Sequence, residues 1–412
     1  MSRVVVTGLG IISSIGIGCP EVLSSLKAQK SGVEFSQEYA DLGFRSHVSG
    51  TIRADINELV PRKLRRFMGD GSAYNYISMV EAIEDAKLME QEIINPRTGL
   101  IMGSGVASGL PLVEMADTLH NRGARRVNPF NVPRIMSSCN AANLATAFKI
   151  KGNSYTISSA CATSSHCLGN AYQMIRAGEQ DLMFVGGGDE ISWIVSIAFD
   201  AMGALSSNFN DKPEKASRTY DRDRDGFVIS GGGGTIVLEE YKHARARGAY
   251  IYCEVTGYGL ASDGFDMVKP SGEGAERCMK MALETVDGPI DYLNAHGTST
   301  PAGDITELDA IANAFDSNGS HNPGGIPPIS STKSLTGHAL GAAGVHEAIY
   351  SILMMEHNFI CPSVNIENLD PNAKGFPIVR EMHTGVELKN IMSNGFGFGG
   401  TNCTLVFGKV DE

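Results

Sequence analysis

A segment of fifteen residues occurs twice in this chain, and the repeat limits the folds that the chain can adopt. Aligned without a gap, Ile157–Ala171 (ISSACATSSHCLGNA) and Ile329–Ala343 (ISSTKSLTGHALGAA) share seven identical residues. Each copy is typical of a short apolar and serine-rich strand that enters a helix. The chain is therefore predicted to be a duplication, in which two halves share one βα topology and are related by a pseudo-twofold axis.

The gapless alignment also brings reactive side chains into register. Cys161 stands opposite Lys333, and His166 stands opposite His338. Strand-to-helix corners are where α/β folds usually bind ligands, because the ends of the strands and the starts of the helices meet there. We therefore expect the functional site at the equivalent corners of the two halves.

Short apolar runs rich in β-branched residues alternate with segments of helical periodicity along the chain, which predicts an α/β fold. We place the division between the halves at residues 1–250 and 251–412. The predicted strands include Val4–Val6, Tyr155–Ile157, Leu182–Val185, Ile236–Leu238 and Leu405–Phe407, and the predicted helices are 72–89, 162–177, 302–315 and 338–357.

Composition excludes several classes of protein. Of the 412 residues, 42% are hydrophobic and 19% are charged, a globular rather than a disordered balance. A net charge of −12 argues against nucleic-acid binding. No apolar run approaches the roughly 18 residues that span a bilayer, and nothing resembles a signal peptide. The 8 Cys include no C-x-x-C pair, so we expect neither a disulfide framework nor a thiolate zinc site. We expect a cytoplasmic location, where thiols stay reduced.

Two motifs imitate ligand sites that the sequence does not support. Val4–Ser13 (VVVTGLGIIS) has Ser13 where a dinucleotide fingerprint needs its third glycine, so we expect a tight structural turn instead. Asp221–Gly226 (DRDRDG) begins like an EF-hand loop, but its twelfth position is Gly232, which cannot supply the bidentate carboxylate. We interpret this second motif as an ion-paired turn.

Cys161 is the candidate nucleophile. A thiol at a helix N-terminus faces unpaired N–H groups and the positive end of the helix dipole, which together lower its pKa. The alternative is a buried, inert cysteine like most of the other seven. The nucleophile is favoured by three further segments, each with chemistry that suits acyl transfer through a thioester: Asn294–Thr300 (NAHGTST) with His296, the second repeat with Lys333 and His338, and the glycine-rich Gly395–Asn402 (GFGFGGTN).

These motifs resemble those of the β-ketoacyl-[acyl-carrier-protein] synthases, elongating condensing enzymes of the thiolase-like superfamily. The resemblance covers essentially the whole chain, and SSACATSSH with RDGFVISGGGG is closer to synthases of type I than to those of type II. It implies the five-layered αβαβα thiolase-like fold made of two duplicated halves, and a homodimer. It also implies an acyltransferase that makes 3-oxoacyl chains by decarboxylative Claisen condensation in fatty-acid elongation.

The resemblance assigns roles residue by residue. Cys161 would take the acyl chain, and His296 and His338 would promote malonyl decarboxylation, with Lys333 fixing their electrostatics and Glu307 supporting Lys333. The N–H groups of Cys161 and Phe398 would form the oxyanion hole. Thr298 and Thr300 would bind the phosphopantetheine arm, and Phe396 and Phe398 would form a gate. Phe199, Phe227 and Val195 would line the acyl pocket, although Phe199 and Phe227 can also be interpreted as ordinary core aromatics.

The implied partner is an acidic acyl carrier protein, whose phosphopantetheine carries the substrates. Two basic groups could receive it: Arg62, Lys63, Arg65 and Arg66, and Arg122, Arg125 and Arg126. Solvated helix faces are the alternative interpretation. The reaction needs no cofactor and no divalent metal, although the family places a monovalent cation near Asn294, Glu347, Ser393 and Asn394.

Two features depart from the family pattern. Asp316–Pro328 is longer than the family leads us to expect, and Gly395 replaces a serine, which we expect to loosen the gate.

Three other functions compete with this interpretation. A thiolase would need a second catalytic cysteine, and the surroundings of Cys403 do not resemble that motif. A non-catalytic chain-length factor would lack the nucleophile. A polyketide ketosynthase would share the whole catalytic set, and acyl-chain preference is not readable from the sequence.

Overall fold

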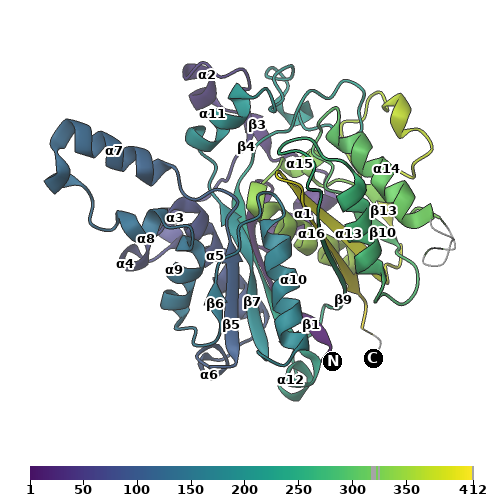
Figure 1. Ribbon diagram of the computed structural model, residues 1–412, viewed down its shortest axis with the longest axis horizontal. Coiled ribbons are helices and arrows are strands. Elements are labelled where there is room, and N and C mark those ends of the chain that lie inside the picture. Colours follow the sequence, from purple (N-terminus) through teal and green to yellow (C-terminus); the bar gives the residue numbers. More distant parts are fainter. Residues whose placement is uncertain (317–321, 323–324, 411–412) are drawn as a thin grey trace.

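The computed structural model describes residues 1–316, 322 and 325–410. Its main sheet consists of two halves (Figure 1). In the N-terminal half the strands run in the order β6-β5-β7-β8-β1, and in the C-terminal half in the order β11-β10-β14-β15-β9. These strands are β1 (Val4–Ser13), β5 (Thr98–Gly103), β6 (Ser154–Tyr155), β7 (Leu182–Asp189), β8 (Gly232–Glu240), β9 (Cys253–Ser262), β10 (Tyr292–Asn294), β11 (Ile329–Ser330), β14 (Asn390–Gly397) and β15 (Thr401–Gly408).

The predicted duplication is confirmed by the strand order and by the strand directions. In both halves the first strand in chain order lies at the inner end of its half, beside the fifth strand of that half. The pairs β5·β6 and β5·β7 are parallel, as are β10·β11 and β10·β14, whereas the remaining pairs of each half are antiparallel. The halves join through β1 and β9, where Val5 faces Glu254 and Val6 faces Cys253.

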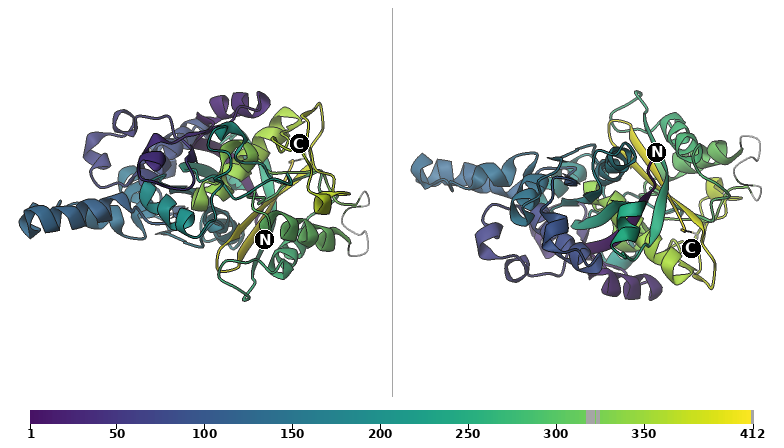
Figure 2. Two further views of the ribbon diagram at one scale, coloured as in Figure 1. Left: turned by 90° about the horizontal axis from the view of Figure 1, so that it is seen from above. Right: turned by 90° about the horizontal axis from the view of Figure 1, so that it is seen from below.

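Helices complete the layers on both sides of each half. The middle layer is made of α10 and α16, which contact each other and the strands of both halves. One outer layer holds α5 and α9 against the N-terminal strands, and the other holds α13 and α14 on the C-terminal side (Figures 1 and 2). The bounds are α5 (Asp70–Asp85), α9 (Cys139–Phe148), α10 (Thr163–Arg176), α13 (Glu273–Leu283), α14 (Gly303–Asp316) and α16 (Ala343–His357). This is the predicted αβαβα architecture, although the precise division at residue 250 stays a prediction.

The gapless alignment of the two copies does not match the residues that are equivalent in the structure. In the first copy, residues 156–162 link β6 to α10, whereas in the second copy residues 331–342 link β11 to α16. The longer link contains an additional helical turn, α15 (Lys333–Thr336). Cys161, two residues before α10, therefore corresponds to Gly341, two residues before α16, and not to Lys333. Sequence identity between the copies reflects shared small residues and turns more than equivalent positions.

The glycines of the first strand do not form the expected tight turn. Gly8 and Gly10 lie inside β1, which continues to Ser13 with a bulge between Val6 and Gly8. A Cβ atom at Gly10 would lie 1.9 Å from the backbone oxygen of Ser78, and one at Gly8 would lie 2.6 Å from that of Ala82. The glycines therefore allow α5 to pack directly on the strand, which is the structural reason for the nucleotide-like pattern.

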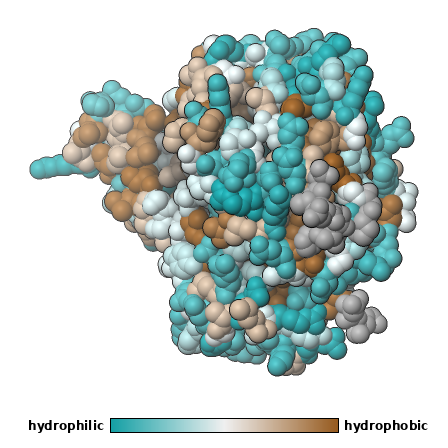
Figure 3. Space-filling model, turned by 45° about the vertical axis from the view of Figure 1, so that its right-hand side comes forward, coloured by the Kyte–Doolittle hydropathy of each residue, from teal (hydrophilic) through white to brown (hydrophobic). Residues whose placement is uncertain are grey.

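A long arm projects from the N-terminal half. It is formed by α7 (Leu110–Arg122), and the segment that follows returns to the body through α8 (Asn131–Ile135), as Figures 1 and 2 show. Leu112, Leu119 and Val132 on this arm are exposed, and hydrophobic residues are visible on it in Figure 3. No helix among the described residues is both long enough and apolar enough to cross a membrane.

The remaining elements are short and lie mainly above the strand ends or at the periphery. They are β2 (Gly16–Ile17), α1 (Cys19–Lys27), β3 (Val33–Phe35), α2 (Gln37–Asp41), β4 (Val48–Gly50), α3 (Ile56–Leu59), α4 (Arg62–Arg65), α6 (Glu90–Ile93), α11 (Trp193–Ala201), α12 (Tyr241–Ala246), β12 (Phe359–Ile360) and β13 (His383–Thr384).

His346 in the middle layer makes the stability of the fold dependent on pH. Burial lowers the pKa of His346 from 6.5 to about 4, and its Nε2 has no hydrogen-bond partner among the described residues. As pH falls below 6.5 the unfolded state takes up the proton first, so this contribution to stability is lost between pH 6.5 and pH 4. When pH is lowered from 7.5 to 5, we expect the free energy of unfolding to fall by about 2 kcal/mol less in His346→Gln than in the wild type.

Urea unfolding of both proteins at the two pH values measures this difference. At pH 7.5 His346 is neutral in both states, so that pH supplies the reference for each variant. Equal pH dependence in the wild type and in His346→Gln would contradict the assignment.

Candidate active site

Cys161 lies in a strained corner ahead of α10. The preceding residue, Ala160, has a φ of +50°, which an alanine rarely adopts. Ser159 is fixed from both sides, because its N–H donates to the Thr163 hydroxyl at 2.8 Å and its carbonyl accepts from the Thr401 hydroxyl at 3.0 Å. The corner thus receives support from α10 and from β15, which belong to different halves of the chain.

The protonation of the thiol differs from the prediction. Burial raises the pKa of Cys161 to about 12, and the charge of Asp189 acts in the same direction. The charge of Lys333 and the backbone N–H groups of Phe398 and Cys161 act to lower it. The predicted electrostatic contributions are therefore present, but desolvation outweighs them in the free protein. The backbone N–H groups of Phe398 and Cys161 therefore lie close enough to the thiol to act on its pKa.

Two histidines from the C-terminal half lie beside each other in the site. The rings of His296 and His338 are nearly perpendicular, with centroids 5.3 Å apart. Burial, together with the charge of Lys333, lowers the pKa of both rings well below the usual range. Both imidazoles are therefore neutral at neutral pH, and each can donate one N–H without carrying a charge.

Lys333 lies behind the histidines and is almost completely buried. Its Nζ is 3.4 Å from Nδ1 of His296 and forms an ion pair with Glu347 of α16. Burial raises the pKa of Glu347 to about 7, and the lysine counteracts that rise. The direct partner of this lysine is Glu347. The charge of Lys333 also reaches Glu307, where it counteracts the rise in pKa that burial causes.

Glu307 instead fixes the backbone of the histidine loop. Its two carboxylate oxygens accept the N–H groups of His296 at 2.8 Å and Gly297 at 2.7 Å, and the Asn394 side chain donates to it at 3.2 Å. Asn394 is itself oriented by the Thr404 hydroxyl at 2.8 Å. Glu307 on α14 therefore supports the position of His296 through the backbone.

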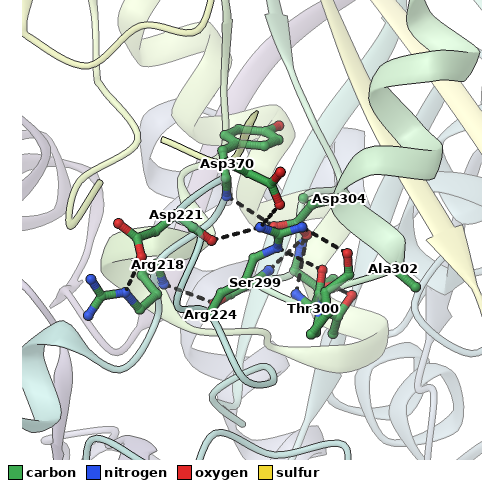
Figure 4. Close-up of polar contacts among 12 residues, drawn as sticks. Arg218, Asp221, Arg224, Ser299, Thr300, Ala302, Asp304 and Asp370 are labelled. Carbon is green, nitrogen blue, oxygen red and sulfur yellow. Dashed lines mark hydrogen bonds and ion pairs between the residues drawn. The ribbon is translucent and has the colours of Figure 1, made fainter. Parts of the chain in front are cut away.

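An ion-paired turn supports the next part of the same loop, as predicted for the EF-hand-like motif. Arg224 donates to the carbonyls of Thr300 at 3.0 Å and Pro301 at 2.8 Å and pairs with Asp370 at 2.7 Å. Asp304 pairs with Arg224 at 3.2 Å and accepts the N–H groups of the segment from Thr298 to Thr300 (Figure 4). This buried pair fixes the loop that carries the two threonines.

A cavity of about 270 Å³ connects these groups. Its lining includes ten of the residues predicted for the site: Cys161, Phe199, Phe227, His296, Thr298, Thr300, Glu307, His338, Phe396 and Phe398. Phe199 contacts Phe227 with ring centroids 5.3 Å apart and Phe398 at 6.2 Å. The two phenylalanines therefore line the cavity in addition to packing in the core.

Val195 and Lys333 contribute from behind the cavity wall. Val195 is buried in the hydrophobic cluster that contains Phe227 and Leu340. Leu340 itself lines the cavity and has a φ of +51°, which the sequence pattern did not reveal. The segment from Asp263 to Gly272 also lines the mouth and was missed, because its exposed Phe265 and Met267 read as an ordinary surface loop.

The departure at Gly395 has a different consequence from the one expected. Gly395 lies inside β14, where it pairs with Cys403, and a Cβ atom there would lie 2.8 Å from the Ser165 hydroxyl. The strand pairing removes the backbone freedom that was expected to loosen the gate. Residues 317–321 and 323–324 of the other departure, Asp316–Pro328, lie outside the described residues.

The four residues expected near a monovalent cation lie in the same buried region. Asn294 of β10 pairs with Ser393 of β14, and Asn394 follows directly. Glu347 faces Lys333 with one oxygen, while its Oε2 is buried and has no partner among the described residues. Such an oxygen fits a cation with oxygen ligands, although no group of three His, Cys, Asp or Glu suitable for a metal occurs among the described residues.

The two basic groups lie on the arm side of the N-terminal half. Arg62, Lys63 and Arg66 are exposed around α4, and Arg122 and Arg125 are exposed at and after the end of α7. The guanidinium of Arg66 lies over the rings of Phe67 at 4.7 Å and Phe130 at 4.8 Å, so the first group contacts the segment that follows the second. Arg65 differs from the others, because it pairs with Asp70 at 2.5 Å.

The comparisons with known proteins agree with this architecture. The family model described as "Beta-ketoacyl synthase, N-terminal domain" matches residues 1–244, and the one described as "Beta-ketoacyl synthase, C-terminal domain" matches residues 252–367. The chain belongs to the β-ketoacyl synthase family. The predicted resemblance is thereby confirmed over both halves of the molecule.

Individual relatives are similar over their full length. The 3-oxoacyl-[acyl-carrier-protein] synthase 1 of Escherichia coli is 57% identical over 414 residues, which cover 100% of both chains. A 3-oxoacyl-[acyl-carrier-protein] synthase 2 of Vibrio cholerae is 38% identical over 417 residues, with 99% of each chain covered. The crystal structure of a β-ketoacyl synthase from Burkholderia phymatum has a TM-score of 0.91 at 35% identity and covers 100% of both chains. The predicted similarity to the type I members is confirmed.

Proposed function

We propose that this chain catalyses the decarboxylative Claisen condensation of an acyl thioester with malonyl-[acyl-carrier protein], which yields 3-oxoacyl-[acyl-carrier protein] and CO2 in fatty-acid elongation. The observation that carries the proposal is the meeting of Cys161, His296 and His338 at one cavity of about 270 Å³. A thiol and two neutral imidazoles supply a nucleophile and two hydrogen-bond donors without a cofactor.

In the first step Cys161 receives the acyl chain. The sulfur attacks the thioester carbonyl, the tetrahedral intermediate loses the phosphopantetheine thiolate, and the proton of the Cys161 thiol passes to that leaving group. Lys333 and the N–H groups of Phe398 and Cys161 favour the thiolate against the cost of burial. The same two N–H groups form the proposed oxyanion hole for the carbonyl oxygen.

In the second step malonyl loses CO2. The C–C bond breaks and its electron pair forms the enolate, so no strong base is required. His296 and His338 donate hydrogen bonds to the enolate oxygen, and their lowered pKa values keep them neutral for this purpose. Lys333 and Glu307 serve as positioning residues, since one contacts Nδ1 of His296 and the other its backbone.

In the third step the enolate carbon attacks the acyl-enzyme. A C–C bond forms at the thioester carbon, the thiolate of Cys161 leaves, and one proton from solvent completes the balance. Thr298 and Thr300 are proposed to bind the phosphopantetheine arm, because both line the cavity on the loop that begins with His296. Phe396 and Phe398 are proposed to act as the gate, and Phe199, Phe227 and Val195 to enclose the acyl chain.

Mass spectrometry of the intact protein tests the proposal. The protein is incubated with an acyl carrier protein that bears acyl chains of defined length, and malonyl carrier is then added. We expect an adduct of the acyl mass on the peptide that contains Cys161, and a 3-oxoacyl product two carbons longer after the second addition. Binding of the carrier without acylation of Cys161 would refute the proposal and would favour a non-catalytic partner.

A thiolase reaction is not supported by the site. Cys403 is completely buried in β15 and is not among the residues that line the cavity. Burial raises the pKa of this thiol well above its usual value. It is therefore poorly placed to act as a second catalytic cysteine.

We further propose that the chain acts as a homodimer in the cytoplasm. The exposed Leu112, Leu119 and Val132 on the arm form an apolar surface that a second copy would cover, and the edge strand β6 exposes Tyr155. The described cysteines are free thiols, as a reducing compartment would maintain them. Light scattering at micromolar concentration gives the mass that distinguishes a dimer from a monomer.

The exposed basic groups are proposed as the docking surface of the acidic acyl carrier. We expect Lys63→Glu combined with Arg66→Glu to raise KM for the carrier about 10-fold at low salt while kcat stays within twofold, because the change removes steering and not chemistry. The difference should shrink as ionic strength rises to 0.5 M. A charge reversal at Lys30, which is exposed and follows α1, serves as the matched control. Equal effects of both changes would contradict a local docking surface.

A further inference from the structure

Asp189 ends β7 and is almost fully buried, with 1% of its surface exposed. Its carboxylate accepts the backbone N–H groups of Gly341 at 2.6 Å, Gly105 at 3.0 Å and Val106 at 3.2 Å, and also the hydroxyl of Ser104. Asp189 does not line the cavity. Four donors around one carboxylate make a rigid junction, because hydrogen bonds to an ionised acceptor are stronger than neutral ones.

This junction joins the two corners that the duplication makes equivalent. Gly341 is the structural counterpart of Cys161 and lies three residues after His338 in the second corner. Gly105 lies against the first corner, because a Cβ atom there would be 3.0 Å from the Ala160 carbonyl oxygen and 3.0 Å from the Gly341 nitrogen. The carboxylate, the Gly105 backbone and the two corners therefore meet at a single point.

Both corners need external support. Ala160, directly before Cys161, has a φ of +50°, and Leu340, directly before Gly341, has a φ of +51°. Each of these left-handed conformations costs a non-glycine residue about 1 kcal/mol or more and persists only where the surroundings enforce it. Asp189 accepts the N–H group of Gly341, the residue after the strained Leu340. It also accepts the N–H group of Gly105, which lies beside the carbonyl oxygen of the strained Ala160.

We propose that Asp189 is a positioning residue that fixes the nucleophile corner of Cys161 relative to the histidine corner of His338. It acts through backbone N–H groups and does not touch the substrate. The inference rests on the proposed function, because it assigns Asp189 to the step in which both corners must act together, the attack of the enolate on the acyl-enzyme. A displacement of reacting groups by a fraction of an ångström to 1 Å lowers such a rate by up to about 10²-fold.

Asp189→Asn is the graded test. The amide replaces one oxygen by an NH2 group that must face donors, and the hydroxyl of Ser104 is the partner that can rotate to accept from it. The Gly341 N–H then keeps a partner, but a neutral and weaker one. We expect kcat for elongation to fall about 10-fold in Asp189→Asn and about 10²-fold in Asp189→Ala, while KM for both carriers stays within twofold.

Glu190→Gln is the matched control. Glu190 is the next residue, is also buried, and accepts the N–H groups of Gly109 at 2.8 Å and Leu110 at 3.3 Å, which belong to the start of the arm. It therefore tests the loss of a buried carboxylate in the same segment without the contact to Gly341. We expect kcat of Glu190→Gln within twofold of the wild type.

Single-turnover measurements separate the proposal from a general loss of stability. Acylation of Cys161 and decarboxylation of malonyl carrier each use one corner, whereas condensation from the preformed acyl-enzyme uses both. We expect Asp189→Asn to slow condensation at least five-fold more than either of the other two reactions. Gly105→Ala inserts a methyl group at the junction and removes no hydrogen-bonding group, and we expect it to show the same pattern. It keeps the test available if Asp189→Ala fails to fold.

Two results would overturn the proposal. The first is a kcat for condensation within twofold of the wild type in both Asp189→Asn and Gly105→Ala. The second is an equal loss in Glu190→Gln. Either result leaves the acyl-enzyme of the wild-type protein unchanged, whereas absence of an acyl adduct on wild-type Cys161 would refute the proposed function itself, so the two failures are distinguishable.

Discussion

Replacement of Cys161 by alanine is expected to abolish elongation, with a fall in kcat of at least about 10⁴-fold, and to leave malonyl decarboxylation measurable. The first step needs the sulfur as the atom that carries the acyl chain, and no other described thiol lines the cavity. The second step depends on hydrogen bonds from His296 and His338, which the substitution does not remove. The two reactions should therefore separate in this variant.

Release of CO2 from labelled malonyl carrier and formation of 3-oxoacyl product, measured in parallel, check this separation. Cys167→Ala supplies the control, because Cys167 is a buried cysteine of the same helix region that does not line the cavity. We expect the control to retain both activities. Retention of elongation in Cys161→Ala, or loss of both activities with the fold intact, would refute the assigned roles.

Replacement of Lys333 by methionine is expected to destabilise the protein by about 3 kcal/mol at pH 8 and to reduce elongation at least about 10²-fold. Lys333 and Glu347 are both only 2% exposed, so removal of the lysine leaves a buried carboxylate without its counter-charge. The pKa of Glu347 is raised to about 7 even with the lysine present, and it will rise further without it. Elongation falls because His296 loses the contact at Nδ1.

The pH dependence identifies the carboxylate as the cause. A carboxyl group with a raised pKa keeps its proton to a higher pH in the folded state than in the unfolded state, so its unfavourable contribution grows as pH rises from 4.5 to the folded pKa and is constant above it. Because the folded pKa of Glu347 is higher without Lys333, the contribution in the variant still grows at pH values where that of the wild type is already constant. The deficit of Lys333→Met, measured by urea unfolding, should therefore be smaller at pH 6 than at pH 8. In the double variant with Glu347→Gln the pH-dependent part of the deficit should disappear, while elongation stays low.

Recovery of elongation in that double variant would contradict the role given to Lys333 beside His296. A deficit of equal size at pH 6 and pH 8 in the single variant would show that packing, and not the unpaired charge, accounts for the lost stability.

The architecture could be predicted because the sequence repeats itself, and a repeated βα unit has few ways to bury its apolar surface. The register could not, since the turn α15 that displaces His338 is made of residues that also suit a continuous helix. The glycines of β1 misled for a related reason. A glycine needed for helix packing and a glycine needed for a turn look alike until the partner at Ser78 is known.

The side chains proposed as catalytic could be selected from the sequence because their motifs are long, and the structure brings Cys161, His296 and His338 to one cavity. Their supporting residues were harder to identify. Glu347 was expected beside a cation and not as the ion-pair partner of Lys333, because the pairing depends on how α16 packs beneath α15. Asp189 carries no local signal, since a carboxylate at the end of a strand is common. Its role depends on Gly105 and Gly341, which only the tertiary fold brings together.

The middle layer has a consequence for how the chain reaches its native state. α10 is packed on α16, whose sequence lies in the last quarter of the chain, so the apolar face of α10 stays uncovered until synthesis is nearly complete. Contacts of such large sequence separation form slowly, and partly folded chains with exposed apolar faces aggregate. We therefore expect a chain that stops before residue 343 to leave this face of α10 exposed and to aggregate rather than form a stable fragment.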